Sequence, residues 1–241
     1  MKISKIVSWL DATLNTSAFD DVSNNGVQIT SSKEEISSVA FAVDASVRSV
    51  EKAAEKGAGM LVVHHGISWG GGIKRLEGGV YRVAKAAIVS DLAVYACHLP
   101  LDAHPVLGNN ARLVKEFNLV KSVRAFRYRS SEIGFVAKAT ARTQNAIDRF
   151  AAAAGVESVR VPSGVLVGVC SGGAGDFAEE AKRRGCEVFI TGEANWGDVI
   201  AAENCGMKML CFGHYATEVW GVRSLSAAMK KALGVQVFDL T

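Results

Sequence analysis

The sequence of 241 residues has no long apolar run, and both histidine and proline are scarce in it. No stretch approaches the ~20 consecutive apolar residues of a membrane-spanning helix. Residues 1–11 also lack the continuous apolar segment of a secretory signal peptide. Since 49% of the residues are hydrophobic, the composition is that of a folded globular protein. We therefore expect a globular chain in the cytoplasm, without a membrane partner.

The chain has almost no surplus of one charge, with 27 Lys and Arg against 24 Asp and Glu. A formal net charge of +3 without a dense basic block gives little electrostatic support for binding to nucleic acid or to an acidic membrane. The composition therefore argues against a nucleic-acid partner.

Cysteine is present five times, but the number is odd and no two cysteines form a CxxC pair. Cys97, Cys170 and Cys211 lie in apolar runs, where a free cysteine behaves as a small hydrophobic residue. A chain of this size does not need a disulfide framework to stabilise its core. We therefore expect free thiols and a reducing compartment.

Short apolar runs alternate with helical patterns along the chain. In the first half, strands are expected at 38–43, 60–63 and 93–97, and helices at 46–56 and 80–89. In the second half, strands are expected at 165–170, 187–190 and 207–212, and helices at 176–184 and 197–205. A further strand is expected at 133–138 and a further helix at 143–154.

Continuous apolar runs separated by helices are typical of parallel strands that are covered on both faces. We therefore predict an α/β fold made of two similar, closely packed α/β halves with mainly parallel sheets covered by helices. The halves are expected at 1–124 and 125–241, with the C-terminal segment as a candidate to pack back on the first half. A dinuclear metal site is expected between them, for the following reasons.

Four of the five histidines follow apolar strand-like runs, namely His64, His65, His98 and His214. In open α/β sheets, ligands bind beyond the carboxyl ends of the strands. The fifth, His104, lies in the loop after His98 and has no assigned role. Imidazole is a common metal ligand, so the positions of these residues indicate a metal site.

The first histidine patch is His64-His65-Gly66. Adjacent residues in a strand point to opposite faces, so two consecutive histidines share one site only where the strand ends. Gly66 permits such an exit because glycine tolerates unusual backbone angles. The alternative interpretation is one packed and one solvated histidine.

The second patch, residues 98–105, contains two prolines and is predicted to be a stiff, non-helical loop. It can present Asp102 as a metal ligand, and His98 as a ligand or as a neighbour of the ligands. The alternative is a loop in which Asp102 caps a helix and the histidines are incidental.

The third patch opens a helical stretch, where His214 and Glu218 are four residues apart and lie on one helix face. A surface His–Glu pair has the same spacing. Together the patches offer five ligands: His64, His65, Asp102, His214 and Glu218. Five ligands are more than one structural zinc uses, and they suit two ions ~3.5–4 Å apart with Glu218 as the bridging carboxylate. The ligand types fit two divalent ions among Zn, Mn, Fe, Co, Ni and Mg.

Other positions keep two interpretations each. Asp44 caps the following helix or contacts the site, and Glu193 is an acid/base group or a structural residue. Residues 171–175 form a tight strand-to-helix turn or bind an anion through backbone N–H groups. Residues 69–72 form a mobile lid or a fixed glycine turn.

Four segments of the chain resemble motifs of the Nif-three-like family, whose members are also called GTP cyclohydrolase 1 type 2 homologues. Residues 19–28 run from Phe-Asp-Asp to Asn-Gly-Val-Gln and resemble the family's N-terminal element, and residues 63–69 contain a His-His-Gly-x-x-Trp element. Residues 98–110 resemble the longest motif of the family, and residues 213–218 resemble its C-terminal signature. The four segments span almost the whole chain, which is similar to the short form without an inserted domain.

The resemblance implies a dinuclear metal site whose ligands are at the positions of His64, His65, Asp102, His214 and Glu218. His98 matches a pocket residue that is not among the family's ligands. The resemblance also implies a toroidal homohexamer with its sites facing an interior cavity. Residues 194–198 depart from the polar or histidine residues that members often place there, which affects the expected substrate contacts.

Three functions are compatible with this pattern. The first is a metal-dependent hydrolase of an unidentified small substrate, with His98 and Glu193 as candidate proton relays. The second is a GTP cyclohydrolase that opens the purine ring. The third is a non-catalytic metal-binding oligomeric scaffold or regulator.

Overall fold

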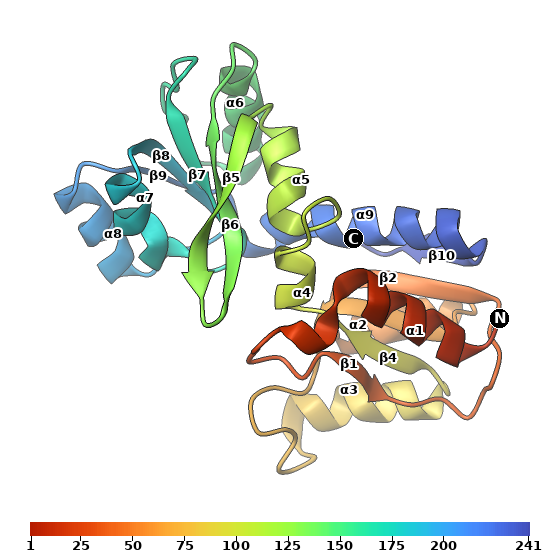
Figure 1. Ribbon diagram of the computed structural model, residues 1–241. Coiled ribbons are helices and arrows are strands. Elements are labelled where there is room, and N and C mark those ends of the chain that lie inside the picture. Colours follow the sequence, from red (N-terminus) through yellow and green to blue (C-terminus); the bar gives the residue numbers. More distant parts are fainter. The chain divides into compact units, whose positions relative to one another are not determined.

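Ten strands form two separate five-stranded sheets, one in each of two units of the chain. The computed structural model describes residues 1–241 (Figure 1). Unit 1 comprises residues 1–101 and 222–241, and unit 2 comprises residues 102–221. The chain enters unit 2 within helix α4 (Leu99–Asp102) and leaves it within helix α9 (His214–Leu233).

The sheet of unit 1 has the strand order β1-β4-β3-β2-β10. Its strands are β1 (Gly26–Ile29), β2 (Ser38–Asp44), β3 (Met60–His65), β4 (Ala93–Ala96) and β10 (Gln236–Asp239). All neighbours are parallel except β1 and β4. The three strands predicted in this half are confirmed as β2, β3 and β4. The C-terminal strand β10 pairs with β2, so the C-terminal segment belongs to unit 1.

Helices cover both faces of the unit 1 sheet. Alternate strand residues such as Ala40 and Leu61 pack with α2 (Val47–Glu55) and α3 (Gly78–Val89). On the other face, the buried Tyr95 hydroxyl donates a hydrogen bond of 2.6 Å to Asp11 of α1 (Ile3–Leu14). A short 3-10 turn, η1 (Thr16–Ala18), follows α1. Figure 1 shows α1 and α3 on opposite sides of the sheet.

Helix α2 begins and ends where its local sequence dictates. The Ser46 side chain accepts a hydrogen bond from the backbone N–H of Ser49, and Ser49 reciprocates at the Ser46 N–H. This capping box satisfies donors that a helix start leaves without partners. Gly57, with φ of +71°, ends the helix in a left-handed conformation that suits glycine. Ser46 is therefore the cap, and the expectation that Asp44 caps this helix is wrong.

The sheet of unit 2 has the strand order β5-β6-β7-β8-β9. Its strands are β5 (Val120–Tyr128), β6 (Ser131–Lys138), β7 (Leu166–Val169), β8 (Cys186–Thr191) and β9 (Lys208–Cys211). The last three are parallel, whereas β5, β6 and β7 are antiparallel neighbours. Strand β5 was not expected, because its first four residues are exposed and give no apolar run.

Helices also cover both faces of the unit 2 sheet. Leu113 of α5 (Asn109–Glu116) and Ile147 of α6 (Thr143–Ala154) share a buried cluster with Val167 of β7. The neighbouring Gly168 faces the other way, since a Cβ there would lie 3.2 Å from Ala181 of α7. That side carries η2 (Gly175–Phe177), α7 (Ala178–Arg183) and α8 (Trp196–Asn204). The predicted α/β class, with sheets covered by helices, is confirmed.

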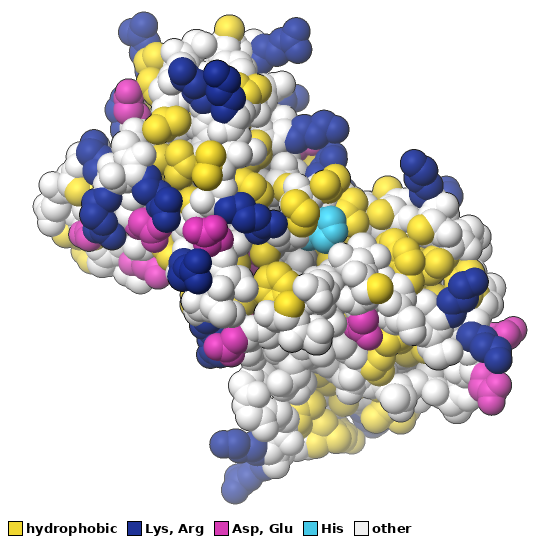
Figure 2. All heavy atoms as spheres, viewed as in Figure 1, with side chains coloured by type: hydrophobic (Ala, Val, Ile, Leu, Met, Phe, Trp, Pro, Cys, Tyr) yellow, Lys and Arg dark blue, Asp and Glu magenta, His cyan; other side chains and the backbone are white.

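Three features of the structure match expectations from the composition: the scattered surface charges, the character of the helices and the state of the cysteines. On the face drawn in Figure 2, Lys and Arg side chains are scattered among acidic and uncharged ones. None of the helices combines the length and the apolar character that crossing a membrane requires. None of the five cysteines forms a disulfide.

Candidate metal centre

The histidines of unit 1 lie at the carboxyl edge of its parallel strands. Strands β2 and β3 pair in register, so that Asp44 stands opposite His65. Strands β3 and β4 pair so that Val63 stands opposite Ala96. The residues that follow these positions therefore leave the sheet at one edge, as expected for ligand-binding residues of an α/β sheet.

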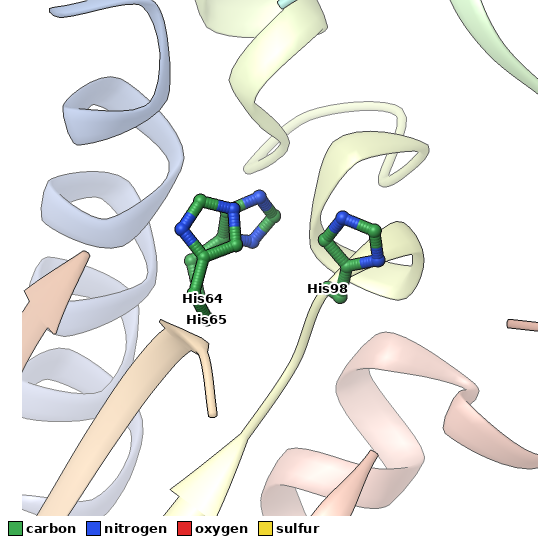
Figure 3. Close-up of side chains that lie close together, drawn as sticks. All are labelled: His64, His65 and His98. Atoms are coloured by element: carbon green, nitrogen blue, oxygen red, sulfur yellow. The ribbon is translucent and has the colours of Figure 1, made fainter. Parts of the chain in front are cut away.

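Three imidazole rings meet at this edge. One ring nitrogen each of His64, His65 and His98 lies within 4.8 Å of the other two. The ring centroids are 4.6 Å apart for His64 and His65, 5.1 Å for His64 and His98, and 5.7 Å for His65 and His98. Figure 3 shows two rings at the end of β3 and the third beyond β4. We call these residues the imidazole cluster.

Each ring of the imidazole cluster has its Nδ1 atom next to an oxygen. The Nδ1 of His64 is 2.9 Å from the Cys97 carbonyl oxygen. That of His65 is 2.8 Å from Oδ1 of Asp44, and that of His98 is 2.8 Å from Oδ1 of Asp21. Carbonyl and carboxylate oxygens only accept, so the Nδ1 atoms donate and the lone pair of each neutral ring is on Nε2.

Asp21 is the most strongly held of these acceptors, with a side chain that is 2% exposed. Its carboxylate accepts from His98, from the side chain of Asn25 and from the backbone N–H groups of Ser23 and Leu99. Burial acts to raise the pKa of Asp21, but these interactions, led by the hydrogen bond with His98, lower it to about 2. Sequence analysis did not find this role, because no spacing rule connects residues 77 positions apart.

Unit 2 holds Asp102 in a buried hydrogen-bonded position. Its Oδ1 accepts from the side chain of Asn109 at 2.9 Å and from the Ser171 hydroxyl at 3.1 Å. All three residues are buried. A carboxylate oxygen of Asp102 also lies within 4.8 Å of one of Glu218. Two buried carboxylates at this distance repel each other, and a bound cation would relieve that repulsion.

His214 lies between two carboxylates of unit 2. Its Nε2 is 3.2 Å from Oε1 of Glu218, and its Nδ1 donates to Oε2 of Glu193 at 3.0 Å. The hydrogen bond with Glu218, followed by the interactions with Glu193, raises the pKa of His214 to about 9 against the lowering effect of burial. Without metal, a proton therefore occupies the place between His214 and Glu218 that an ion can take.

Gly172 allows the close approach of backbone to Glu218. Its φ is +69°, and a Cβ there would lie 2.5 Å from Oε1 of Glu218 and 3.3 Å from Nε2 of His214. Nearby, burial raises the pKa of the Cys170 thiol, and Asp102, Asp176 and Glu218 raise it further. Burial and the neighbouring carboxylates therefore favour the protonated thiol at Cys170.

Each unit thus brings its own predicted site residues together. Unit 1 gathers His64, His65 and His98, and unit 2 gathers Asp102, His214 and Glu218 with Glu193. The imidazole and carboxylate donors of both sets fit divalent metal ions.

Other positions singled out in the sequence make the following contacts. Asp44 is the hydrogen-bond partner of His65. Residues 171–175 form a turn between β7 and η2, in which the Ser171 hydroxyl donates to Asp102. His104 accepts from the backbone N–H groups of Val106 and Leu107 and so organises its own loop.

The sequence is similar to curated proteins over its whole length. It is 38% identical over 248 residues to the GTP cyclohydrolase 1 type 2 homolog of Pyrococcus horikoshii, covering 98% of this chain and 96% of that protein. It is 39% identical over 244 residues to the protein of the same name from Archaeoglobus fulgidus, covering 100% and 98%.

The fold is similar to solved structures. The structure of protein ybgI, described as being of unknown function, matches with a TM-score of 0.87 at 28% identity, covering 100% of this chain and 98% of that one. The crystal structure of TTHA1606 from Thermus thermophilus matches with a TM-score of 0.84 at 27% identity and the same coverage. The model of the Duf34/NIF3 (NGG1p interacting factor 3) family matches residues 1–241, and the chain therefore belongs to this family.

Proposed function

We propose that the chain is a metal-dependent hydrolase that binds two divalent ions through His64, His65, Asp102, His214 and Glu218. The observation that carries this proposal is that each unit gathers its own share of these residues and orients them by hydrogen bonds. Hydrogen-bonded partners behind the ligands are typical of metal sites, where they fix the tautomer and direction of each ligand. Membership of the Duf34/NIF3 family is consistent with it.

Within unit 2, Glu218 has the position that suits a bridging ligand. It is next to His214 on one side and within 4.8 Å of Asp102 on the other. A carboxylate has two oxygens and can therefore bind two ions at once, as in dinuclear hydrolytic sites. The side chain is only 3% exposed, so its orientation is set by packing.

When bound, such ions polarise substrate oxygens and acidify water to a pKa of ~7. Glu193 would hold His214 by accepting its Nδ1 proton, which is a positioning role. The sequence also put forward Glu193 and His98 as proton relays. His98 is suited to this role because Asp21 fixes its Nδ1 proton and leaves Nε2 to accept or donate one.

Metal removal and reloading test this function. Metal-stripped protein is expected to lose turnover of phosphoesters, cyclic amides and nucleotides by more than ~100-fold, and divalent ions are expected to restore it. Glu218→Gln should lose one ion per chain and Asp102→Ala should be inactive, whereas the control His104→Asn should keep both ions and activity. Full activity of a preparation that elemental analysis shows to be metal-free would contradict the proposal.

The name of the curated relatives adds a specific substrate to this screen, since they are called GTP cyclohydrolase 1 type 2 homologs. Ring opening of GTP, followed by absorbance and mass spectrometry, would identify this alternative. Stoichiometric metal binding without turnover of any substrate would instead support the non-catalytic scaffold. The family resemblance also leads us to propose a homohexamer, for which native mass spectrometry should give about six times the 25.5 kDa of the chain.

A further inference from the structure

We propose that His98 is a metal ligand, and that the imidazole cluster of unit 1 is a three-histidine site able to hold one ion by itself. This assigns His98 a role other than that of a proton relay. The inference rests on the proposed function only in that both require divalent ions at His64 and His65.

The arrangement of the three rings carries this proposal. His64 and His65 end β3, His98 follows the neighbouring parallel strand β4, and one nitrogen of each lies within 4.8 Å of the others. A zinc-sized ion has bonds of about 2.0–2.1 Å to imidazole nitrogen, so its ligand nitrogens are a little over 3 Å apart. On binding, the three nitrogens would draw together to this distance around the ion. Three protein nitrogens with an open fourth position are also the ligand set of one class of catalytic zinc site.

The oxygen partners of the rings point to the same conclusion. All three Nδ1 atoms are held at 2.8–2.9 Å by Cys97, Asp44 and Asp21, so all three rings have the same tautomer. A histidine that only transfers protons does not need two neighbours with that tautomer. Histidines that bind one ion together do need the same tautomer, because the ion binds Nε2 of each ring while a carboxylate or carbonyl oxygen accepts the proton on Nδ1. His98 satisfies this pattern as fully as His64 and His65.

The contact between Trp69 and His98 further restricts the orientation of this ring. The Trp69 indole lies edge-on to the His98 ring at a centroid distance of 5.2 Å, and its N–H donates to the Gly66 carbonyl oxygen. The His98 backbone N–H also donates to Asn25. The ring is therefore held from the side as well as through Asp21, as expected of a preorganised ligand.

The donor set narrows the kind of ion. Three neutral imidazoles favour borderline transition metals such as Zn²⁺, Co²⁺, Ni²⁺ or Fe²⁺, whereas Mg²⁺ prefers oxygen ligands. The imidazole cluster therefore takes a transition-metal ion and disfavours Mg²⁺. It would keep that ion when the carboxylates of unit 2 are removed.

A variant that lacks the ligands of unit 2 tests this directly. The full chain carrying Asp102→Asn, His214→Ala and Glu218→Gln together is loaded with Co²⁺, passed over a desalting column and analysed for metal. We expect one Co²⁺ per chain, with visible absorption typical of a nitrogen-ligated ion. Adding His98→Ala should abolish this binding, and adding the control His104→Asn should leave it unchanged.

Pulsed EPR of the same variant loaded with Cu²⁺ gives a second measurement that counts the coordinated imidazoles. Three coordinated imidazoles are expected, and a count of two would exclude His98 as a ligand.

Asp21→Asn in the native chain is expected to weaken binding of Co²⁺ by about 10–100-fold, because it removes the carboxylate that orients His98. If the triple variant does not fold by circular dichroism, His98→Ala in the native chain replaces it. That change should weaken binding of one Co²⁺ by more than ~100-fold, more than the loss of an orienting partner costs.

The outcomes separate this proposal from the proposed function. A folded triple variant without Co²⁺, or His98→Ala protein that keeps both ions at native affinity, overturns the ligand role of His98 alone. Native protein that binds ions through three imidazoles but turns over no substrate overturns the hydrolase alone. Native protein that binds no transition metal overturns both.

Discussion

Gly172→Ala is expected to remove one bound ion per chain while the protein stays folded. The new Cβ would lie 2.5 Å from Oε1 of Glu218, a distance at which one of the two groups must move. The surrounding backbone is held, since the Gly172 N–H donates to Thr217 and its carbonyl oxygen accepts from Gly192 and Glu193. We therefore expect the added Cβ to push the Glu218 carboxylate out of its position beside His214.

The backbone cost of this change can be measured separately. Gly172 has φ of +69°, so alanine there costs about 1–2 kcal/mol whatever its side chain contacts. Gly185→Ala is the matched control, because Gly185 has φ of +81° and its added Cβ would meet only Leu166 at an ordinary 3.7 Å. Both variants should lose stability in urea unfolding, Gly172→Ala more because its Cβ also displaces a buried side chain, but only Gly172→Ala should lose an ion by elemental analysis. Equal metal contents would show that Glu218 tolerates the displacement and is not a critical ligand.

Elements with strong local patterns could be predicted from the sequence. Strand β2 is a run of apolar residues buried on both faces, and α6 (Thr143–Ala154) was predicted with its exact limits. The short edge strands β1 and β10 were not predicted, because four residues paired on one side carry little hydrophobic signal. The antiparallel strand β5 was missed for a related reason, since it is largely exposed.

In the candidate site, too, residues with a local sequence pattern could be predicted and residues placed by tertiary packing could not. Histidine positions after strands, and the four-residue spacing of His214 and Glu218, predicted residues that lie close together within unit 1 or unit 2. Asp102 was expected in the first half of the chain, with His64 and His65, but it belongs to unit 2. The supporting residues Asp21, Asn109 and Gly172 were not identified in these roles, because they contact the site residues through tertiary packing. Glu193 was put forward as an acid/base group or a structural residue, and its contact with Nδ1 of His214 is likewise a product of tertiary packing.

Asn109→Ala is expected to give a large loss of stability in unit 2. Asn109 is completely buried, and its side chain donates to Asp102 at 2.9 Å and accepts from the Gly221 N–H at 2.8 Å. Leaving a buried donor or acceptor without its partner costs about 1–3 kcal/mol, so the two losses together should lower the free energy of unfolding by about 2–5 kcal/mol. The affinity for the ion bound by Asp102 should also fall by about 10–100-fold.

Two further substitutions separate these effects. Asn145→Ala removes an exposed asparagine from α6 of the same unit and should change stability by less than about 0.5 kcal/mol. Asn109→Asp keeps an acceptor for Gly221 but places a second carboxylate oxygen against Asp102. It should therefore destabilise the metal-free protein through charge repulsion, and a bound divalent ion should recover part of that loss in thermal unfolding. If Asn109→Asp unfolds at the native temperature without metal and divalent ions do not raise that temperature, the expected charge repulsion at Asp102 is absent and this prediction is wrong.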